Sequence, residues 1–241
     1  MTPTPPARFY FNLRSPYSWL AVHDLTTRHP RLAAALDWRP FWEPDQGGGK
    51  LLAEAGGRFL YTPMTPEKHR YILADVRRLA RARGLDITWP VDREPHWEVA
   101  HLGYLAAEQA GRGRAFAVAA SRARWERGMD ISDPEQVGRI GVEIGLDADR
   151  VATAWQDPGL VALGTAALYA LYDDSVFGVP YFLCGRERFW GVDRLPDFVA
   201  CVAEHPLTAA DPASAADEPS ADAVVPMLLD GAQYDHAGGC G

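Results

Sequence analysis

The segment Asn12–Trp19 (NLRSPYSW) holds the residues with the clearest potential for chemistry. Ser15 ends an aromatic run that alternates like a strand, and Pro16 after it suits the first position of a helix. Beyond the carboxyl end of a strand, free N–H groups and the helix dipole favour a bound anion, which a hydroxyl could help to stabilise. Ser15 could equally serve only as the N-cap of the helix. The residues alone leave both roles open.

Two further motifs lie later in the chain. Gly178–Pro180 (GVP) directly precedes an apolar run. A proline at a strand start indicates a fixed bend, made either by a cis peptide bond or by a simple strand entry. Trp190–Arg194 (WGVDR) follows that run, and there Asp193 is typical of a helix N-cap and Arg194 of a surface charge.

The thiols and imidazoles show no metal-binding pattern. Cys184 and Cys201 stand in apolar stretches, which is typical of small core residues, and Cys240 stands in a polar tail; no C-x-x-C pair is present. His96 and His101 are five residues apart, which places them on different faces of a helix. The sequence therefore predicts no metal site.

The elements that position Ser15 form a strand, a helix and a strand. Alternating hydrophobicity predicts strands at 8–13 and 36–42, and a capped apolar stripe predicts a helix at 17–28 between them. Such a unit joins two strands that pair in parallel.

A long helical stretch separates this unit from the later motifs. Glycines and a proline divide it into helices, expected near 66–83, 97–110, 114–128, 134–144, 148–155 and 158–173. A hairpin at 179–184 and 188–190 and a closing helix at 193–204 follow.

This order predicts an α/β fold, namely a thioredoxin-like sheet interrupted by a large all-helical insertion, although periodicity alone leaves other α/β folds open. We expect a discontinuous thioredoxin-like domain at 8–63 and 174–205, and a helical insertion domain at 64–173. Residues 206–241, rich in Ala, Asp, Pro and Ser, are expected to form a flexible acidic C-terminal tail.

Charge and hydropathy exclude two classes of partner. The 241 residues carry a net charge of −8, of which the tail supplies −6, because it contains six acidic residues and no Lys or Arg. A nearly neutral body argues against nucleic acid as the main partner. No apolar run approaches the roughly 20 residues of a membrane span. The first residues lack the pattern of a signal peptide, so a cytoplasmic location is expected.

Three segments together resemble one family. FYFNLRSPYSWLA at 9–21, RWERGMDISDP at 124–134 and VFGVPYFLCGRERFWGVDRL at 176–195 are similar to the 2-hydroxychromene-2-carboxylate isomerase and kappa-class glutathione transferase family, relatives of the disulfide oxidoreductase DsbA. The likeness covers about 8–204, and SPYS, GVP and GxDR in this order are specific as a combination. The family fold, a thioredoxin domain with a helical insertion, agrees with the order of elements.

The resemblance implies a bound glutathione, or another low-molecular-weight thiol, with its sulfur beside Ser15. A helix N-terminus and a hydroxyl hydrogen bond lower the pKa of a thiol, so Ser15 would stabilise the thiolate rather than attack. Val179, which precedes Pro180, would offer its backbone to the cysteinyl unit. Asp193, as a buried carboxylate assisted by Arg194, would meet the γ-glutamyl end.

The chain departs from the family in the glycine-rich stretch 42–50 (WEPDQGGGK), where relatives often supply an Asn from a loop. Lys50 is expected to replace it in part. The substrate pocket is expected to have aromatic walls, although each wall residue could be a core residue instead. These residues are Tyr17, Trp19, Trp42 and Trp190.

The expected activity is a thiol-dependent isomerase or transferase of a small conjugated, aromatic enone. Reversible thiolate addition would turn the double bond into a single bond, and rotation followed by thiol elimination would give the isomer. A non-catalytic thiol- or peptide-binding module is an alternative. A DsbA-like oxidoreductase is another, but it needs thiols where Ser15 and Ser18 stand. The expected partner is a small molecule, neither nucleic acid nor membrane, and a homodimer stays open.

The C-terminal Gly-Cys-Gly suggests one more hypothesis. Cys240 and Gly241 have the chemistry of the Cys-Gly end of glutathione, and a flexible tail of this length reaches roughly 30 Å. Cys240 could therefore enter the thiol site as a tethered nucleophile or self-inhibitor. An incidental thiol in a disordered tail is the simpler interpretation.

Overall fold

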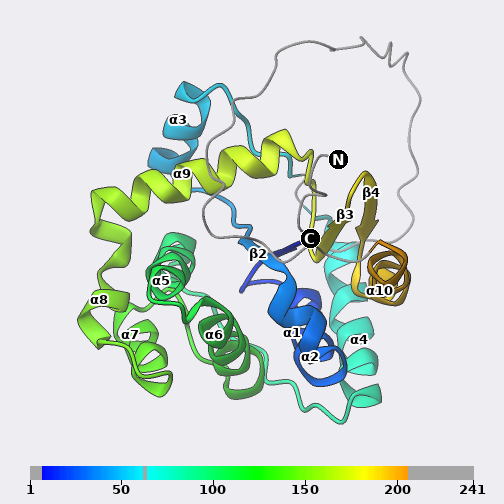
Figure 1. Cartoon of the computed structure of the whole chain (residues 1–241). Coiled ribbons are helices and arrows are strands. Elements are labelled where there is room, and N and C mark those ends of the chain that lie inside the picture. Colours follow the sequence, from blue (N-terminus) through cyan, green and yellow to red (C-terminus); the bar gives the residue numbers. More distant parts are fainter. Residues whose placement is uncertain (1–6, 62–63, 206–241) are drawn as a thin grey trace, which may run out of the picture.

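A four-stranded mixed sheet forms the centre of the computed structural model, which describes residues 7–61 and 64–205. Its strands are β1 (Arg8–Phe11), β2 (Asp37–Pro40), β3 (Tyr181–Cys184) and β4 (Glu187–Trp190). The order is β2-β1-β3-β4, with β1 parallel to β2 and antiparallel to β3, and β3 antiparallel to β4 (Figure 1). Strands from both ends of the described chain thus meet in one sheet.

Helices make up most of the remaining structure. Their bounds are α1 (Pro16–Arg28), α2 (Pro30–Ala35), α3 (Gln46–Glu54), α4 (Pro66–Ala82), α5 (Trp97–Gln109), α6 (Gly113–Arg127), α7 (Pro134–Glu143), α8 (Ala148–Ala152), α9 (Pro158–Asp173) and α10 (Leu195–Glu204). Short 3₁₀ turns occupy Ala154–Gln156 and Val192–Arg194. In Figure 1, α5 to α8 gather on the left, and β3, β4 and α10 lie on the right.

The helices between 66 and 173 lie within three residues of their predicted bounds, because strong local signals end and begin them. Gly111, Gly128 and Gly145 have φ near +70° to +80°, a conformation that suits glycine after a helix. Asp133 and Asp157 cap the helices that follow, each accepting a backbone N–H and each preceding a proline.

The glycine-rich stretch after β2 forms a helix, α3, where the sequence predicted no element. Asp45 caps it by accepting the Gly48 N–H at 2.7 Å, and Leu52, only 1% exposed, anchors it to the core. The cap and one apolar anchor outweigh the low helix propensity of glycine. Lys50 lies on the exposed side of α3, where it forms an ion pair with Glu54 at 3.8 Å.

Aromatic side chains join the sheet to the helices. The Phe9 ring stacks on Phe182 at 5.0 Å, and Phe182 stacks on Phe198 of α10 at 4.9 Å. On the same face of the sheet, Phe11 meets the edge of Tyr104 of α5 at 5.0 Å, and the Tyr104 hydroxyl donates to a backbone oxygen of β2 at 2.9 Å. The core is therefore continuous from the sheet into the long helical segment.

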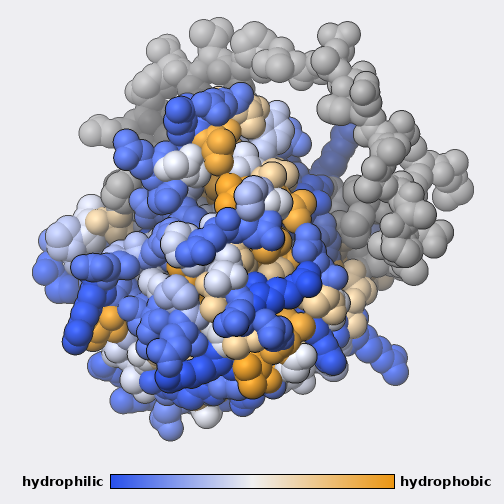
Figure 2. Space-filling view, turned by 90° about the vertical axis from the view of Figure 1, so that its left-hand side faces the viewer, coloured by the Kyte–Doolittle hydropathy of each residue, from blue (hydrophilic) through white to orange (hydrophobic). Residues whose placement is uncertain are grey.

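The surface is mainly polar where it can be viewed. Figure 2, seen from the side of α8, shows hydrophilic residues over most of this face, with apolar residues in smaller patches between them. Of the helices in the described part of the chain, none is both long and apolar enough to cross a membrane.

Candidate functional site

Ser15 caps α1 with its oxygen and keeps its proton available. Its Oγ accepts the Ser18 N–H at 3.2 Å, and its own N–H donates to the Asn12 carbonyl at 2.9 Å. The Ser18 hydroxyl in turn accepts the Asn12 N–H at 3.1 Å. Within the described residues, no acceptor takes the proton of Ser15, whose side chain is almost fully buried. This hydroxyl can therefore donate to a ligand while it continues to cap the helix.

Two side chains of the helical segment hold the turn that precedes Ser15. The Leu13 N–H donates to His101 Nε2 at 3.2 Å, and the Leu13 carbonyl accepts Trp125 Nε1–H at 3.1 Å. His101 Nδ1 donates to the Trp97 carbonyl at 2.6 Å, which fixes the tautomer that leaves Nε2 as an acceptor. Burial lowers the pKa of His101 to about 4, so its ring is neutral at neutral pH.

A cavity of about 440 Å³ opens beside Ser15, between the start of α1, α4 and the end of α6. Its surface is mostly apolar. The apolar surface comes from several parts of the chain, namely Phe41, Phe59, Ile72, Trp89 and Trp125. A flat aromatic molecule fits the volume and the character of such walls.

Two buried N–H groups of this cavity's lining residues have no acceptor among the described residues. They are Arg124 Nε and Trp89 Nε1. Arg124 also forms a bidentate pair with Asp92, at 2.8 Å for both bonds, and its guanidinium lies 5.0 Å from the Trp125 ring. Since a buried donor without an acceptor is costly, an oxygen-bearing ligand that reached either N–H would stabilise the site.

One of the four expected wall residues lines this cavity. This residue is Tyr17, and its hydroxyl donates to Asp75 of α4 at 2.7 Å. Trp19 is buried against α6, stacked on Trp125 at 6.4 Å, because it points to the other side of α1. Trp42 stacks on His101 at 5.4 Å and lines a different cavity.

The fourth, Trp190, packs against Phe177 at 4.7 Å and against the backbone of Gly178. Like Trp19 and Trp42, it is absent from the lining of the Ser15 cavity. The core-packing interpretation therefore describes these three tryptophans better than the pocket-wall interpretation.

The Val179–Pro180 peptide bond is cis, one of the two arrangements that the sequence left open. Asp193 differs from the expectation of a buried carboxylate, because its side chain is 72% exposed and lies 3.6 Å from Arg194. The side chains of Asp193, Arg194 and Lys50 do not line the Ser15 cavity. Their thiol-binding roles remain predictions, and Cys240 lies outside the described residues.

The two described cysteines lie together at the edge of the sheet. Burial, together with a hydrogen bond to Cys201, raises the pKa of Cys184 to about 12. A thiol held protonated in this way is a weak nucleophile. Both residues are predicted to be small core residues, and in the structure Cys184 is buried and Cys201 half-buried.

Sequence reasoning missed the contributions of the helical segment. His101 and Trp125 hold the turn before Ser15, and Arg124 with Asp92 forms one wall of the cavity. A scattered His and an Arg on a helix carry no local signal of such a role. Only the packing of α5 and α6 against the strand–helix junction brings them there.

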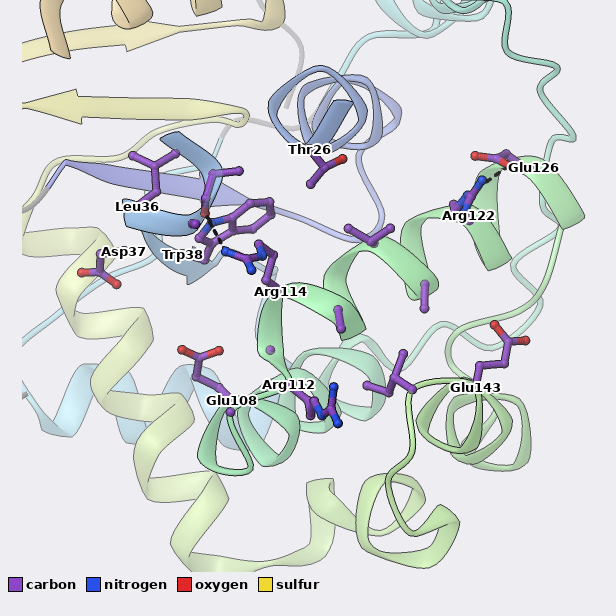
Figure 3. Close-up of a pocket in the computed structure, with 18 of the residues that line it drawn as sticks. Thr26, Leu36, Asp37, Trp38, Glu108, Arg112, Arg114, Arg122, Glu126 and Glu143 are labelled. Carbon is purple, nitrogen blue, oxygen red and sulfur yellow. Dashed lines mark hydrogen bonds and ion pairs between the residues drawn. The ribbon is translucent and has the colours of Figure 1, made fainter. Parts of the chain in front are cut away.

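A larger cavity of about 800 Å³ lies between the α2–β2 region and α6, and is a weaker candidate (Figure 3). Figure 3 shows charges of both signs around it, including the ion pair of Arg122 with Glu126 at 3.6 Å. Arg127 and Glu143 pair at 3.1 Å across the same region. Its described lining residues include neither serine nor cysteine, and its charges largely offset one another.

Comparison with known proteins agrees with this fold. The family model of the DSBA-like thioredoxin domain matches residues 8–203. A 2-hydroxychromene-2-carboxylate isomerase of Sphingobium xenophagum is 30% identical over 195 residues, which cover 79% of this chain and 94% of that protein. These matches confirm the family resemblance and the expected α/β fold with a helical insertion.

Solved structures show the same fold. A structure of 2-hydroxychromene-2-carboxylate isomerase aligns with a TM-score of 0.65 and 19% identity, over 83% of this chain and 95% of the other. The cytosolic disulfide reductase DsbM of Pseudomonas aeruginosa, solved with GSH, aligns with a TM-score of 0.52 and 18% identity, over 83% and 98% of the two chains.

Proposed function

The chain belongs to the family of DsbA-like thioredoxin domains, and from this premise we propose that it is a thiol-dependent isomerase. Its substrate would be a small conjugated aromatic acid, either 2-hydroxychromene-2-carboxylate or a compound like it. The isomerase relative supports this reaction class by its name and by its 30% identity over most of both chains. The solved relative with GSH supports glutathione, or a similar thiol, as the cofactor.

One observation carries the proposal. The Ser15 hydroxyl, with its proton unused by the described residues, lies at the wall of a mostly apolar cavity whose lining also includes two unpaired buried donors. A hydroxyl donor at a helix N-terminus fits a thiolate, and the cavity beside it fits the second reactant.

Each residue of the site would have a separate role in the reaction. Ser15 would donate its hydrogen bond to the thiolate, and the N–H groups of α1 would favour the negative charge. When bound, the thiol would supply a sulfur nucleophile that adds reversibly to the double bond of the substrate. His101 and Trp125 would act as positioning residues, because they fix the turn that carries Ser15.

The unpaired donors would orient the substrate. Arg124 Nε and Trp89 Nε1 could donate to the carboxylate or ketone oxygens, and the aromatic walls would contact the ring. Asp92 already neutralises the Arg124 charge. The contact would therefore act mainly by directed hydrogen bonds, which favour one orientation of a planar acid.

The disulfide oxidoreductase alternative finds no support in this site, because Ser15 and Ser18 stand where its two thiols would be. The non-catalytic binding module differs from the proposed isomerase only in turnover. A thermal shift with glutathione tests binding, and an ultraviolet assay on 2-hydroxychromene-2-carboxylate, with and without glutathione, tests catalysis.

We expect both a shift and thiol-dependent turnover. Stabilisation without turnover on this substrate or on a benzylidene-pyruvate would favour the binding module. Turnover at the same rate without any thiol would contradict the proposed mechanism.

A further inference from the structure

Asp45, His96 and Glu98 are three side chains that can bind a metal ion, and their ligand atoms lie close together in space. His96 Nε2 lies 3.9 Å from Asp45 Oδ2 and 3.6 Å from Glu98 Oε2. All three ligand atoms lie within 4.8 Å of one another. Two ligands of a tetrahedral ion, each about 2.1 Å from it, are about 3.4 Å apart, so small shifts of the side chains would bring both carboxylate oxygens and the imidazole onto one ion.

Backbone N–H groups hold both carboxylates in place. Asp45 Oδ1 accepts the Gly48 N–H at 2.7 Å as the cap of α3, and Glu98 Oε1 accepts the Asp45 N–H at 2.6 Å. The second oxygen of each carboxylate is the one that faces His96. This arrangement fixes the donors before any ion arrives, which lowers the cost of binding.

The local charge is poorly balanced without a cation. No Lys or Arg of the described chain forms an ion pair with either carboxylate. A bound divalent cation would offset both negative charges.

The three side chains border a cavity of about 270 Å³ between α3, α5 and α9. Trp42 lines this cavity, is 2% exposed, and has an indole N–H without an acceptor in the described structure. The ring edge next to this N–H faces Gly164, which also lines the cavity. This N–H is itself buried, so a water or ligand oxygen in the cavity would reach it only after its neighbours shift.

We infer that Asp45, His96 and Glu98 form a binding site for a divalent first-row transition ion such as Zn²⁺, with its remaining coordination positions open toward the Trp42 cavity. One imidazole and two carboxylates form a nitrogen and oxygen donor set that suits such an ion. Waters or an oxygen-bearing small molecule bound to the ion would fill the cavity. The sequence predicted no metal site, because Asp45 is distant and His96 lies just before α5.

Equilibrium dialysis of the untagged, metal-free full chain against Zn²⁺ tests this inference. We expect about one ion per chain at this site. Asp45→Asn, Glu98→Gln and His96→Asn should each weaken its binding at least tenfold. Both amide variants keep an oxygen for the backbone hydrogen bonds, so the fold should survive, which circular dichroism can check.

Two control variants locate the ion. Glu54→Gln removes an exposed carboxylate of α3 and should leave binding unchanged. Cys201→Ser disables the second cluster of potential ligands, Cys184 with Cys201 and His205. Substituted Co²⁺ should show visible bands without the intense near-ultraviolet band of sulfur ligands.

Absence of Zn²⁺ binding by the parent would overturn the inference and leave an ordinary ion pair of His96 with its neighbours. Binding that is lost only in Cys201→Ser, or kept in all three ligand variants, would overturn it as well. None of these outcomes depends on isomerase activity.

Discussion

The two atoms of the Ser15 hydroxyl have different roles: one stabilises the helix, and the other is proposed to bind a ligand. The oxygen caps α1, and the proton remains for a ligand. Ser15→Ala should lower turnover about 100-fold, as expected for the loss of one preorganised donor. The lost cap should also lower the free energy of unfolding by about 1 kcal/mol. Steady-state kinetics and urea unfolding measure the two effects separately.

Ser121→Ala is the matched control, because Ser121 is also buried but lines none of the cavities described. It should leave turnover unchanged. If Ser15→Ala loses stability but keeps full turnover, Ser15 is a helix cap and nothing more.

Asp193 can be tested by the affinity for glutathione. Its carboxylate is largely exposed, so its contact with the γ-glutamyl ammonium would be worth about 0.2 to 1 kcal/mol, and Asp193→Asn should weaken binding by about 1.4-fold to fivefold. A buried carboxylate would have given a larger effect. Isothermal titration can resolve the difference. Asp197→Asn, an exposed neighbour, should have no effect, and an equal loss in both variants would argue against a specific role for Asp193.

At the scale of elements, local signals predicted most of the fold. Glycines end several helices of the helical stretch, and Asp–Pro pairs begin two of them. The alternation of apolar and polar residues predicted the strands. Two short helices escaped prediction. α2 lacks a side-chain cap, and α3 begins with a run of glycines whose helical state depends on the Asp45 cap and on tertiary contacts.

The candidate site was only partly predictable for a related reason. Ser15 could be found because a strand–helix junction has a local signature. His101 and Arg124 could not, because their roles arise from the docking of α5 and α6. Trp19, Trp42 and Trp190, which do not line the Ser15 cavity, show the same limit, since an aromatic residue near a motif can face either side of its element.

The docking of α5 should make stability depend on pH. His101 has a pKa of about 4 in the folded chain, against an ordinary value of 6.5, because it is buried. Between these values the unfolded chain binds more protons, so stability is full above pH 6.5 and falls as the pH drops toward 4. The expected loss from this residue between pH 7 and pH 5 is about 2 kcal/mol.

Urea unfolding at both pH values measures this loss. His101→Gln, which can still accept the Leu13 N–H, should remove most of the dependence. An unchanged pH dependence in this variant would assign the effect to other groups.

On the scale of the whole molecule, the sheet and the helical segment share one core. Tyr104 joins them, so Tyr104→Phe should leave the Trp38 carbonyl without its donor and lower the free energy of unfolding by about 1 to 2 kcal/mol. The unfolding transition should stay single, because both parts depend on the same contacts. Urea titrations followed by fluorescence and by circular dichroism should coincide.

Tyr71→Phe, at an exposed position on α4, is the control and should change stability by less than about 0.5 kcal/mol. Two separated transitions in Tyr104→Phe, with only the helical signal lost early, would show that the two parts unfold independently.

The pairing of β1 also has a consequence for synthesis on the ribosome. One edge of β1 can pair with β2 soon after synthesis. The other edge can pair only after β3 has been synthesised, because Arg8 pairs with Leu183, about 175 residues later. At about 5 to 20 residues per second, that edge stays open for roughly 10 to 35 seconds in each nascent chain. An unpaired strand edge with aromatic side chains invites association between chains. Yield in a cell should therefore depend on translation speed and on chaperones that cover nascent chains.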